Sequence, residues 1–162
     1  MKILLALCLV VANAAMAAEP STVARELVIA GDVQHELRLK PDDLRQIAKR
    51  RGVVEQNGYS GIRLVDLLAE AQIKDDARLA LRRTYIVAVA TDNYPAVFSW
   101  GELYNSPGGA SIIVATDRDG QPLREGEGQF ALVALGDTRP GPRHVKWLTR
   151  IEVRRVPEGA PR

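Results

Sequence analysis

The sequence predicts one mixed α+β domain in which strands predominate. Residues 84–91 and 111–116 are nearly continuous runs of β-branched and small apolar residues, which is typical of central strands. Residues 62–73 instead repeat leucine with helical spacing. The chain of 162 residues contains no internal repeat and has the length of one domain with one core. We therefore expect a single α+β domain over residues 25–155, with a C-terminal tail at 156–162.

Residues 1–17 have the layout of a cleavable secretory signal. They contain one charged residue, Lys2, then an apolar run, and end in the small-x-small sequence Ala-Met-Ala. The apolar run is short for a membrane span, and no second one follows. We expect cleavage before Ala18, a tail over residues 18–24, and a periplasmic protein with no direct membrane insertion. An uncleaved anchor is the alternative.

Composition excludes several classes of chemistry. Cys8 is the only cysteine and lies inside the predicted signal, so a cleaved chain has no disulfide, thiolate metal ligand or cysteine nucleophile. The 22 basic residues nearly balance the 20 acidic ones, for a net charge of +2. This balance argues against nonspecific binding of nucleic acid, which needs a broad basic surface. Any site for an anion must therefore consist of a small cluster of basic residues.

The first part of the domain predicts a hairpin and two helices. Two β-like runs in residues 26–40 flank the turn pair Gly31-Asp32. Proline at 41 and the two aspartates after it are typical of a helix N-terminus. The second helix is amphipathic, because apolar residues recur at i, i+3, i+4 and i+7. These core positions are Leu64, Leu67, Leu68 and Ala71.

The later elements are strands joined by turns. Residues 129–135 read as a strand. Residues 117–120, Asp-Arg-Asp-Gly, predict a tight turn, since they lack the further ligands of a calcium loop. Residues 126–128 form a glycine pair with no helix signal after it, so we expect a flexible connection and no phosphate-binding loop.

The last strand is expected over residues 145–155, where apolar and charged residues alternate. This alternation places Trp147 mostly in the core and Lys146 on the opposite face, with Leu148 as the one break in the pattern. Unless a bulge intervenes, the two side chains cannot contact one ligand together. The indole is therefore expected to be structural.

Hydrolytic and zinc chemistry find little support. His35 and His144 are the only histidines, and no Gly-x-Ser-x-Gly or His-Glu-x-x-His motif occurs. The remaining side chains are instead typical of a site that recognises a ligand. Arg143 and Lys146 are typical partners of a phosphate or carboxylate. Flat side chains for a heteroaromatic ring, and carboxylates for an amino-pyrimidine edge, are also available. The flat side chains are Tyr59, Tyr94, Trp100, Tyr104 and Trp147, and the carboxylate is that of Asp92 or Asp137.

The segments together resemble the molybdopterin-binding core of the sulfite oxidase family over roughly residues 25–155. The most specific matches are Gly-x-x-Leu-x-Asp-Leu-Leu at 61–68, Asp-x-Tyr at 92–94, and Gly-Asp before Arg-x-Val-Lys-Trp-Leu at 143–148. The resemblance implies a compact, strand-rich α+β fold. It also implies that Arg143 and Lys146 belong to a segment that contacts the cofactor.

The family's enzymes bind molybdenum through a cysteine that lies shortly before the segment matching YSGIRLVDLL. Residues 51–59 stand there in this chain and contain no cysteine. A soft thiolate ligand has no substitute among them. We therefore expect a pterin, either a tetrahydropterin or a molybdopterin-like compound, without molybdenum, and no enzymatic oxidation.

The chain is thus similar to small periplasmic pterin-binding members of this fold, the PruR type, which act on a membrane-bound cyclic-di-GMP enzyme. We expect a ligand-dependent partner of such an enzyme, with its function in signalling and biofilm control. The expected ligand-binding residues are Arg143, Lys146, Asp137, Arg139, His144, Tyr94, Asp92 and Trp100. The sequence leaves open which tryptophan, if either, stacks on the ligand.

Two other functions remain. One is a molybdenum-cofactor oxidoreductase, or an accessory protein, of the sulfite oxidase family. The other is an interaction module whose pocket no longer binds a ligand. The identity of the pterin, its oxidation state and the oligomeric state are open at this point.

Overall fold

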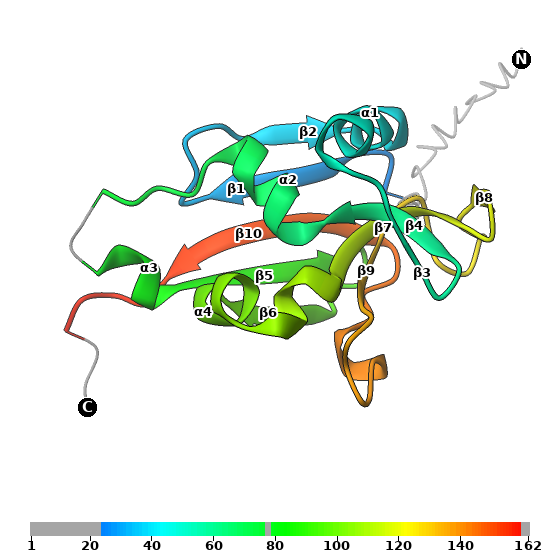
Figure 1. Cartoon of the computed structure of the whole chain (residues 1–162). Helices are drawn as coiled ribbons and strands as arrows, with labels where there is room; N and C mark the ends of the chain where they lie inside the picture. Colours follow the sequence, from blue (N-terminus) through cyan, green and yellow to red (C-terminus); the bar gives the residue numbers. More distant parts are fainter. Residues whose placement is uncertain (1–23, 77–78, 160–162) are drawn as a thin grey trace, which may run out of the picture.

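Two sheets form the framework of the computed structural model, which describes residues 24–76 and 79–159 (Figure 1). The first sheet contains, in spatial order, β2 (Leu37–Leu39), β1 (Leu27–Gly31), β10 (Leu148–Arg155), β5 (Thr84–Ala90) and β6 (Pro95–Ser99). The second contains β3 (Val54–Gln56), β4 (Tyr59–Arg63), β7 (Ile112–Arg118) and β8 (Gln121–Pro122), with β9 (Ala131–Ala134) also paired to β7. The predicted signal over residues 1–17 lies outside the described residues.

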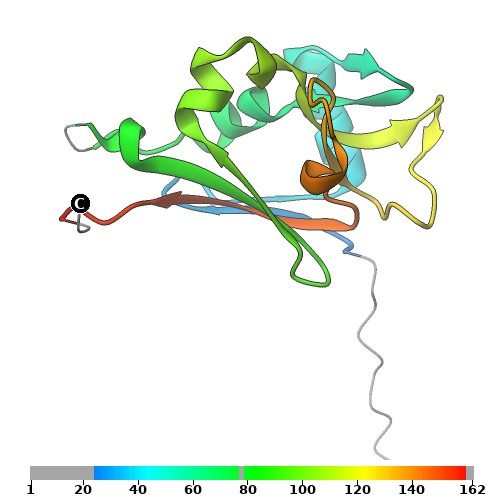
Figure 2. The same cartoon turned by 90° about the horizontal axis from the view of Figure 1, so that it is seen from below.

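The helices and the second sheet lie on one face of the first sheet (Figure 2). The α-helices are α1 (Pro41–Arg51), α2 (Leu64–Ala71), α3 (Ala80–Arg83) and α4 (Trp100–Asn105). The short 3₁₀ helices are η1 (Pro107–Ser111) and η2 (Gly141–Arg143). Within the described part of the chain, no helix is long and apolar enough to cross a membrane. The mixed, strand-rich α+β prediction is confirmed.

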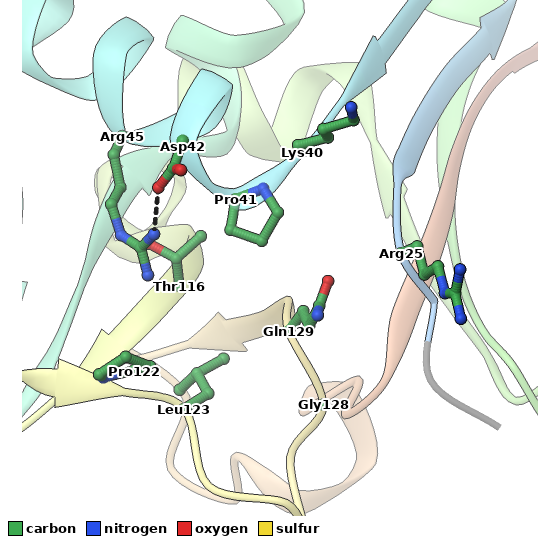
Figure 3. A pocket seen from close by; sticks show the side chains of 10 residues that line it. All are labelled: Arg25, Lys40, Pro41, Asp42, Arg45, Thr116, Pro122, Leu123, Gly128 and Gln129. Atoms are coloured by element: carbon green, nitrogen blue, oxygen red, sulfur yellow. Dashed lines mark hydrogen bonds and ion pairs between the residues drawn. The ribbon is translucent and has the colours of Figure 1, made fainter. Parts of the chain in front are cut away.

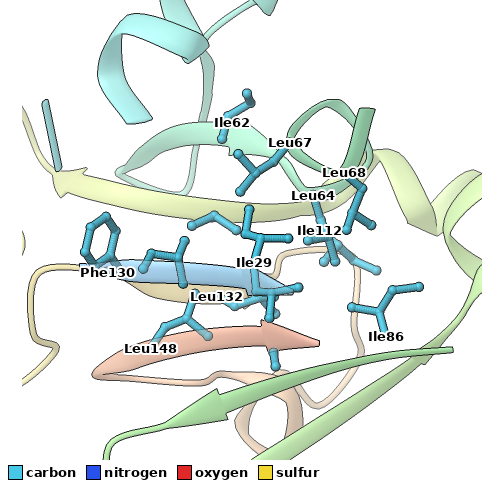
Figure 4. Close-up of a cluster of buried hydrophobic side chains, with 14 of the residues drawn as sticks. Ile29, Ile62, Leu64, Leu67, Leu68, Ile86, Ile112, Phe130, Leu132 and Leu148 are labelled. Atoms are coloured by element: carbon cyan, nitrogen blue, oxygen red, sulfur yellow. The ribbon is translucent and has the colours of Figure 1, made fainter. Parts of the chain in front are cut away.

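The main core lies between α2 and the strands of both sheets (Figure 4). The predicted helical positions Leu64, Leu67, Leu68 and Ala71 are all fully buried. They pack with Ile29, Ile86, Ile112 and Leu148 from four different strands. Each buried Leu or Ile side chain contributes about 1.5–3 kcal/mol of transfer free energy. This shared core fixes the two sheets relative to each other.

Of the two predicted turns, one has the expected form. The strands β1 and β2 pair antiparallel, although their connection spans residues 32–36 instead of the two residues Gly31-Asp32. Asp119 and Gly120 join β7 to β8 as a two-residue hairpin, with φ of 53° and 74°. These positive values are those of a type I′ turn, so the turn prediction for residues 117–120 is confirmed.

Two sequence-based predictions were wrong, one for residues 126–128 and one for the last strand. Residues 126–128 are not an open flexible connection, because Glu127 and Gly128 are both buried. The last strand begins at Leu148 rather than at residue 145, and Trp147 has a φ of 46°. This left-handed residue, with an irregular register between Leu148 and Arg150, breaks the alternation. As a result Leu148 enters the core, while the indole of Trp147 is only half-buried.

Candidate ligand-binding site

A cavity of about 340 Å³ opens where the β5–β6 hairpin meets the loop before β10. This volume is within the range of small-molecule sites, near its lower end. The cavity is lined by Ala90, Asp92, Tyr94, Gly141, His144, Lys146 and Trp147. It therefore brings together four of the residues predicted to bind a ligand, and it adds the tryptophan that the strand pattern placed in the core.

The β5–β6 hairpin positions the side chains of Asp92 and Tyr94. Asn93 turns the chain with a φ of 68°, and the backbone N–H of Tyr94 donates to Oδ1 of Asp92 at 2.9 Å. The hydroxyl of Tyr94 donates to the carbonyl oxygen of Pro142 at 2.8 Å. The hairpin and the η2 segment are thereby connected across the cavity, and the phenol ring is held even though Tyr94 is 43% exposed.

The segment before β10 positions Lys146 and Trp147, which also line the cavity. The N–H of Trp147 donates to the carbonyl of Glu127 at 2.8 Å, and its carbonyl accepts from the N–H of Thr91 at 3.1 Å. These two bonds hold residue 147 in its left-handed conformation. The local irregularity brings the half-buried indole and the exposed Lys146 to the same cavity, which strict alternation would have prevented.

Arg143 and Asp137 were also predicted to meet the ligand, but they bind each other. The guanidinium donates to Asp137 from Nε at 2.7 Å and also from Nη2, and Nη1 donates to Glu102. It lies over the ring of Phe98, with Cζ 4.9 Å from the centroid. Hydrogen bonds to Asp137 and then to Glu102 raise the pKa of Arg143 above its ordinary value. The arginine thus fixes the loop and does not line the cavity.

Arg139 and Trp100 also lie outside the set of residues that line the cavity. Arg139 is exposed in the loop before η2. Trp100 begins α4 and stacks on Tyr104, with ring centroids 4.9 Å apart and an interplanar angle of 17°. Of the two tryptophans, Trp147 is the one placed to contact a ligand in this cavity.

A buried polar cluster that the sequence did not reveal lies behind the cavity. Glu127 is 6% exposed and accepts a hydrogen bond from the Tyr59 hydroxyl at 2.5 Å. Nη1 of Arg118 lies 3.1 Å from that hydroxyl oxygen and 3.5 Å from Oε1 of Glu127. Burial, followed by the bond to Glu127, raises the pKa of Tyr59 to about 12. The three side chains come from β4, β7 and the turn before β9.

His144 connects this buried cluster to the cavity. Its Nε2 lies 3.6 Å from Oε1 of Glu127 and has no hydrogen-bond partner among residues 24–76 and 79–159. The ring meets Tyr59 edge-on, with centroids 5.7 Å apart. Burial lowers the pKa of His144, with Glu127 opposing the effect and Lys146 and Arg118 adding to it. The lowered pKa favours the neutral imidazole over the charged one.

The lowered pKa of His144 predicts that stability falls on mild acidification. Below the ordinary histidine pKa of 6.5 the unfolded chain takes up a proton that the folded chain accepts only at lower pH. The free energy of unfolding therefore decreases as the pH falls. Urea unfolding at pH 7.5 and 5.5 measures this difference. We expect a smaller fall in His144→Gln, and an unchanged fall in His35→Gln, which alters an exposed histidine. Equal falls in wild type and His144→Gln would contradict the assignment.

A second, larger cavity of about 590 Å³ lies at the beginning of α1 (Figure 3). Its walls are Arg25, Lys40, Pro41, Asp42, Arg45, Thr116, Pro122, Leu123, Gly128 and Gln129. Arg45 is held there by Asp117, with Nε and Nη2 each 3.0 Å from a carboxylate oxygen, and by Asp42 at 2.8 Å. No aromatic side chain lines this cavity. It offers a flat heteroaromatic ring no stacking surface, and none of the predicted site residues is part of it.

Comparison with known proteins shows the family to which the chain belongs. Residues 18–161 match the model of the oxidoreductase molybdopterin-binding domain. The chain belongs to this family. It is 28% identical over 131 residues to rat mitochondrial sulfite oxidase, a match that covers 78% of this chain and 23% of that protein. The family-level resemblance predicted from the sequence is thus confirmed.

The same fold occurs in the crystal structure of the sulfane dehydrogenase SoxCD from Paracoccus pantotrophus. The two chains superpose with a TM-score of 0.59 and 21% identity, over 85% of this chain and 40% of that one. At this identity the likeness shows the fold alone. The chain spans less than half the length of either relative.

The described residues fit the organic part of a molybdopterin better than its metal. Tyr94 and Trp147 can flank a pterin ring, and Asp92 and Lys146 supply an acceptor and a cation. Residues 24–76 and 79–159 contain no cysteine and no cluster of three or more metal-binding side chains. They therefore provide no sulfur of the kind that molybdenum prefers.

Proposed function

We propose that this protein is a periplasmic pterin-binding protein that does not itself catalyse oxidation. The observation that carries the proposal is the combination, around one 340 Å³ cavity, of two aromatic side chains with a carboxylate and a lysine. Membership of the molybdopterin-binding family supports a pterin-type ligand. The absence of a cysteine from the described residues supports binding without metal chemistry.

Each wall of the cavity has a distinct part in the proposed complex. Asp92 accepts hydrogen bonds from the amino-pyrimidine edge through the carboxylate oxygen that does not bond Tyr94. Asp137, the alternative for this role, is occupied by Arg143. Tyr94 and Trp147 flank the ring, and each contact is worth about 0.5–1.5 kcal/mol beyond area burial. Lys146 binds a polar or anionic group of the ligand.

Fluorescence titration with a panel of oxidised and reduced pterins tests the proposal. We expect a bound pterin to quench Trp147, so quenching persists in Trp100→Phe and is lost in Trp147→Leu. Lys146→Gln is expected to weaken binding about tenfold, as loss of one charged contact worth about 1.4 kcal/mol would. Lys49→Gln, at an exposed position of α1, is the matched control. Failure of folded protein to bind any pterin would overturn the proposal.

The proposed role is that of a ligand-dependent partner of a membrane cyclic-di-GMP enzyme, in control of biofilm formation. In support, the hydroxyl of Tyr94 at the cavity donates a hydrogen bond to the carbonyl of Pro142 in η2. An occupied cavity therefore stabilises a loop that reaches the surface. Co-purification of such an enzyme from membranes, with and without added pterin, tests this role. Binding that is independent of pterin would favour an interaction module, and absence of the protein from the periplasmic fraction would exclude the location.

The second candidate is a molybdenum-cofactor oxidoreductase or its accessory protein. The matched relative named sulfite oxidase favours it. Elemental analysis of protein purified from a cofactor-producing host distinguishes the two. Molybdenum at one atom per chain would support the oxidoreductase, and protein that carries a pterin without the metal would support the binding protein.

A further inference from the structure

The imidazole of His144 lies between the candidate cavity and a buried carboxylate that has no direct access to it. His144 lines the cavity, and Glu127 behind it is 6% exposed. Between them, His144 Nε2 and Glu127 Oε1 are 3.6 Å apart, just beyond an ordinary hydrogen bond. A nitrogen that is buried without a partner next to a carboxylate is an incomplete ion pair, and a proton on the ring would complete it.

Charged groups from every neighbouring element determine whether that proton is present. Lys146 and Arg118 oppose it and Glu127 favours it, while burial disfavours any charge on the ring. Arg118 is largely committed to Tyr59 and Glu127. Lys146 is exposed and lines the cavity, as does Asp92, whose carboxylate holds the Tyr94 N–H. Lys146 is therefore the opposing charge that a bound ligand can neutralise.

An anionic ligand group beside Lys146 changes this balance in one direction. It offsets the repulsion between the ammonium and a protonated imidazole, which Glu127 already attracts. The proton comes from solvent and goes to the imidazole, whose Nε2–H then donates to Oε1 of Glu127. A neutral ligand in the same cavity leaves Lys146 uncompensated, so no proton is drawn in.

We propose that the site binds an anionic pterin together with one proton, which His144 accepts and Glu127 stabilises, so that Glu127 determines the preference for anionic ligands. This inference rests on the proposed pterin-binding function. Glu127 has no access to the ligand in this arrangement and acts as a positioning residue through His144. The anionic group is a carboxylate or a phosphate on the pterin side chain, since both bind lysine in the same way.

Calorimetric titration in two buffers of different ionisation enthalpy, PIPES and BIS-TRIS at neutral pH, measures the protons taken up. The probes are 6-carboxypterin, a neopterin phosphate and the uncharged 6-hydroxymethylpterin. We expect uptake of about half to one proton with the two anionic probes, and close to none with the neutral one. The affinity for the anionic probes should decrease as the pH rises from about 6 to 8, and that for the neutral probe should not.

Glu127→Gln is the deciding variant, because it keeps an acceptor for Tyr59 and removes the charge. We expect proton uptake to disappear and the affinity for 6-carboxypterin to fall about tenfold, with less than about a threefold change for 6-hydroxymethylpterin. His144→Gln should also abolish uptake. Glu125→Gln, an exposed acid in the same turn, is the control and should behave as wild type.

The outcomes separate this inference from the proposed function. Binding of 6-carboxypterin without proton uptake, or with equal uptake in Glu127→Gln, overturns the proton linkage and leaves pterin binding in place. If Glu127→Gln does not fold, the buffer comparison between wild type and His144→Gln still decides whether the proton is taken up at this imidazole. Absence of binding by all three probes overturns both.

Discussion

Replacement of Gly61 by alanine is expected to lower the free energy of unfolding by about 3 kcal/mol or more, at the upper end of the effects of overpacking. A Cβ at this position would lie 2.1 Å from the carbonyl oxygen of Val114 and 2.7 Å from the Cα of Ala115. Both atoms belong to the backbone of β7, so no side chain can rotate away. The pairing of β4 with β7 is irregular between Ser60 and Gly61, which explains the close approach.

Thermal and urea unfolding measure the effect. For a domain of this size, about 3 kcal/mol corresponds to a fall in Tm of roughly 6–12 °C. The matched control is Gly101→Ala in α4, where a Cβ meets no atom within 4 Å. We expect that variant to be neutral or slightly more stable, because alanine favours a helix. A Gly61→Ala protein as stable as Gly101→Ala would mean that β4 and β7 lie farther apart than described.

The fold was predictable where one periodicity applies to a whole segment. The i, i+3, i+4 and i+7 positions of α2 are all buried. The strand β5 lies within the predicted run 84–91, whereas β7 begins in the predicted run 111–116 and continues to Arg118. The Gly61 position belongs to the motif that begins YSG, and its requirement for glycine comes from a neighbouring strand 53 residues later in the sequence. No local pattern contains that contact.

The candidate site was only partly predictable, because a single backbone angle decides much of it. Asp92, Tyr94, His144 and Lys146 lie at the cavity as predicted, although their binding of a ligand stays a prediction. The alternation rule misplaced Trp147, since it assumes extended geometry and residue 147 is left-handed. Arg143 was expected to be free for an anion, but it binds Asp137 of the same loop and Glu102 of the distant helix α4.

Glu127 shows the limit of sequence reasoning most clearly. The segment Gly-Glu-Gly gives a turn signal, and an acid in a turn is usually solvated. Its burial depends on Tyr59, Arg118 and His144, which come from three different segments of the chain. The one local signal was Gly128, which allows the turn to pack closely against Trp147.

Replacement of Gly128 by alanine is expected to weaken pterin binding at least about tenfold and to cost about 2 kcal/mol of stability. Gly128 has a φ of 79°, and a Cβ there would lie 2.7 Å from Cδ1 of Trp147 and 2.8 Å from its Cα. The backbone of Trp147 is held by Glu127 and Thr91. Because the added Cβ also meets the Cα of Trp147, rotation of the indole alone does not relieve the contact. Residue 147 must shift relative to the turn, and this shift displaces one aromatic wall of the cavity.

The control for this prediction lies two residues away. Gly126→Ala adds the same methyl group in the same turn, where a Cβ meets nothing within 4 Å. We expect that variant to bind pterin as wild type does in fluorescence titration, with a shift of Trp147 emission seen only in Gly128→Ala. If Gly128→Ala loses stability but keeps full affinity, Trp147 is not a wall of the ligand site. The ring would then have to bind against Tyr94 alone, which is 43% exposed and gives a weaker, more solvated contact.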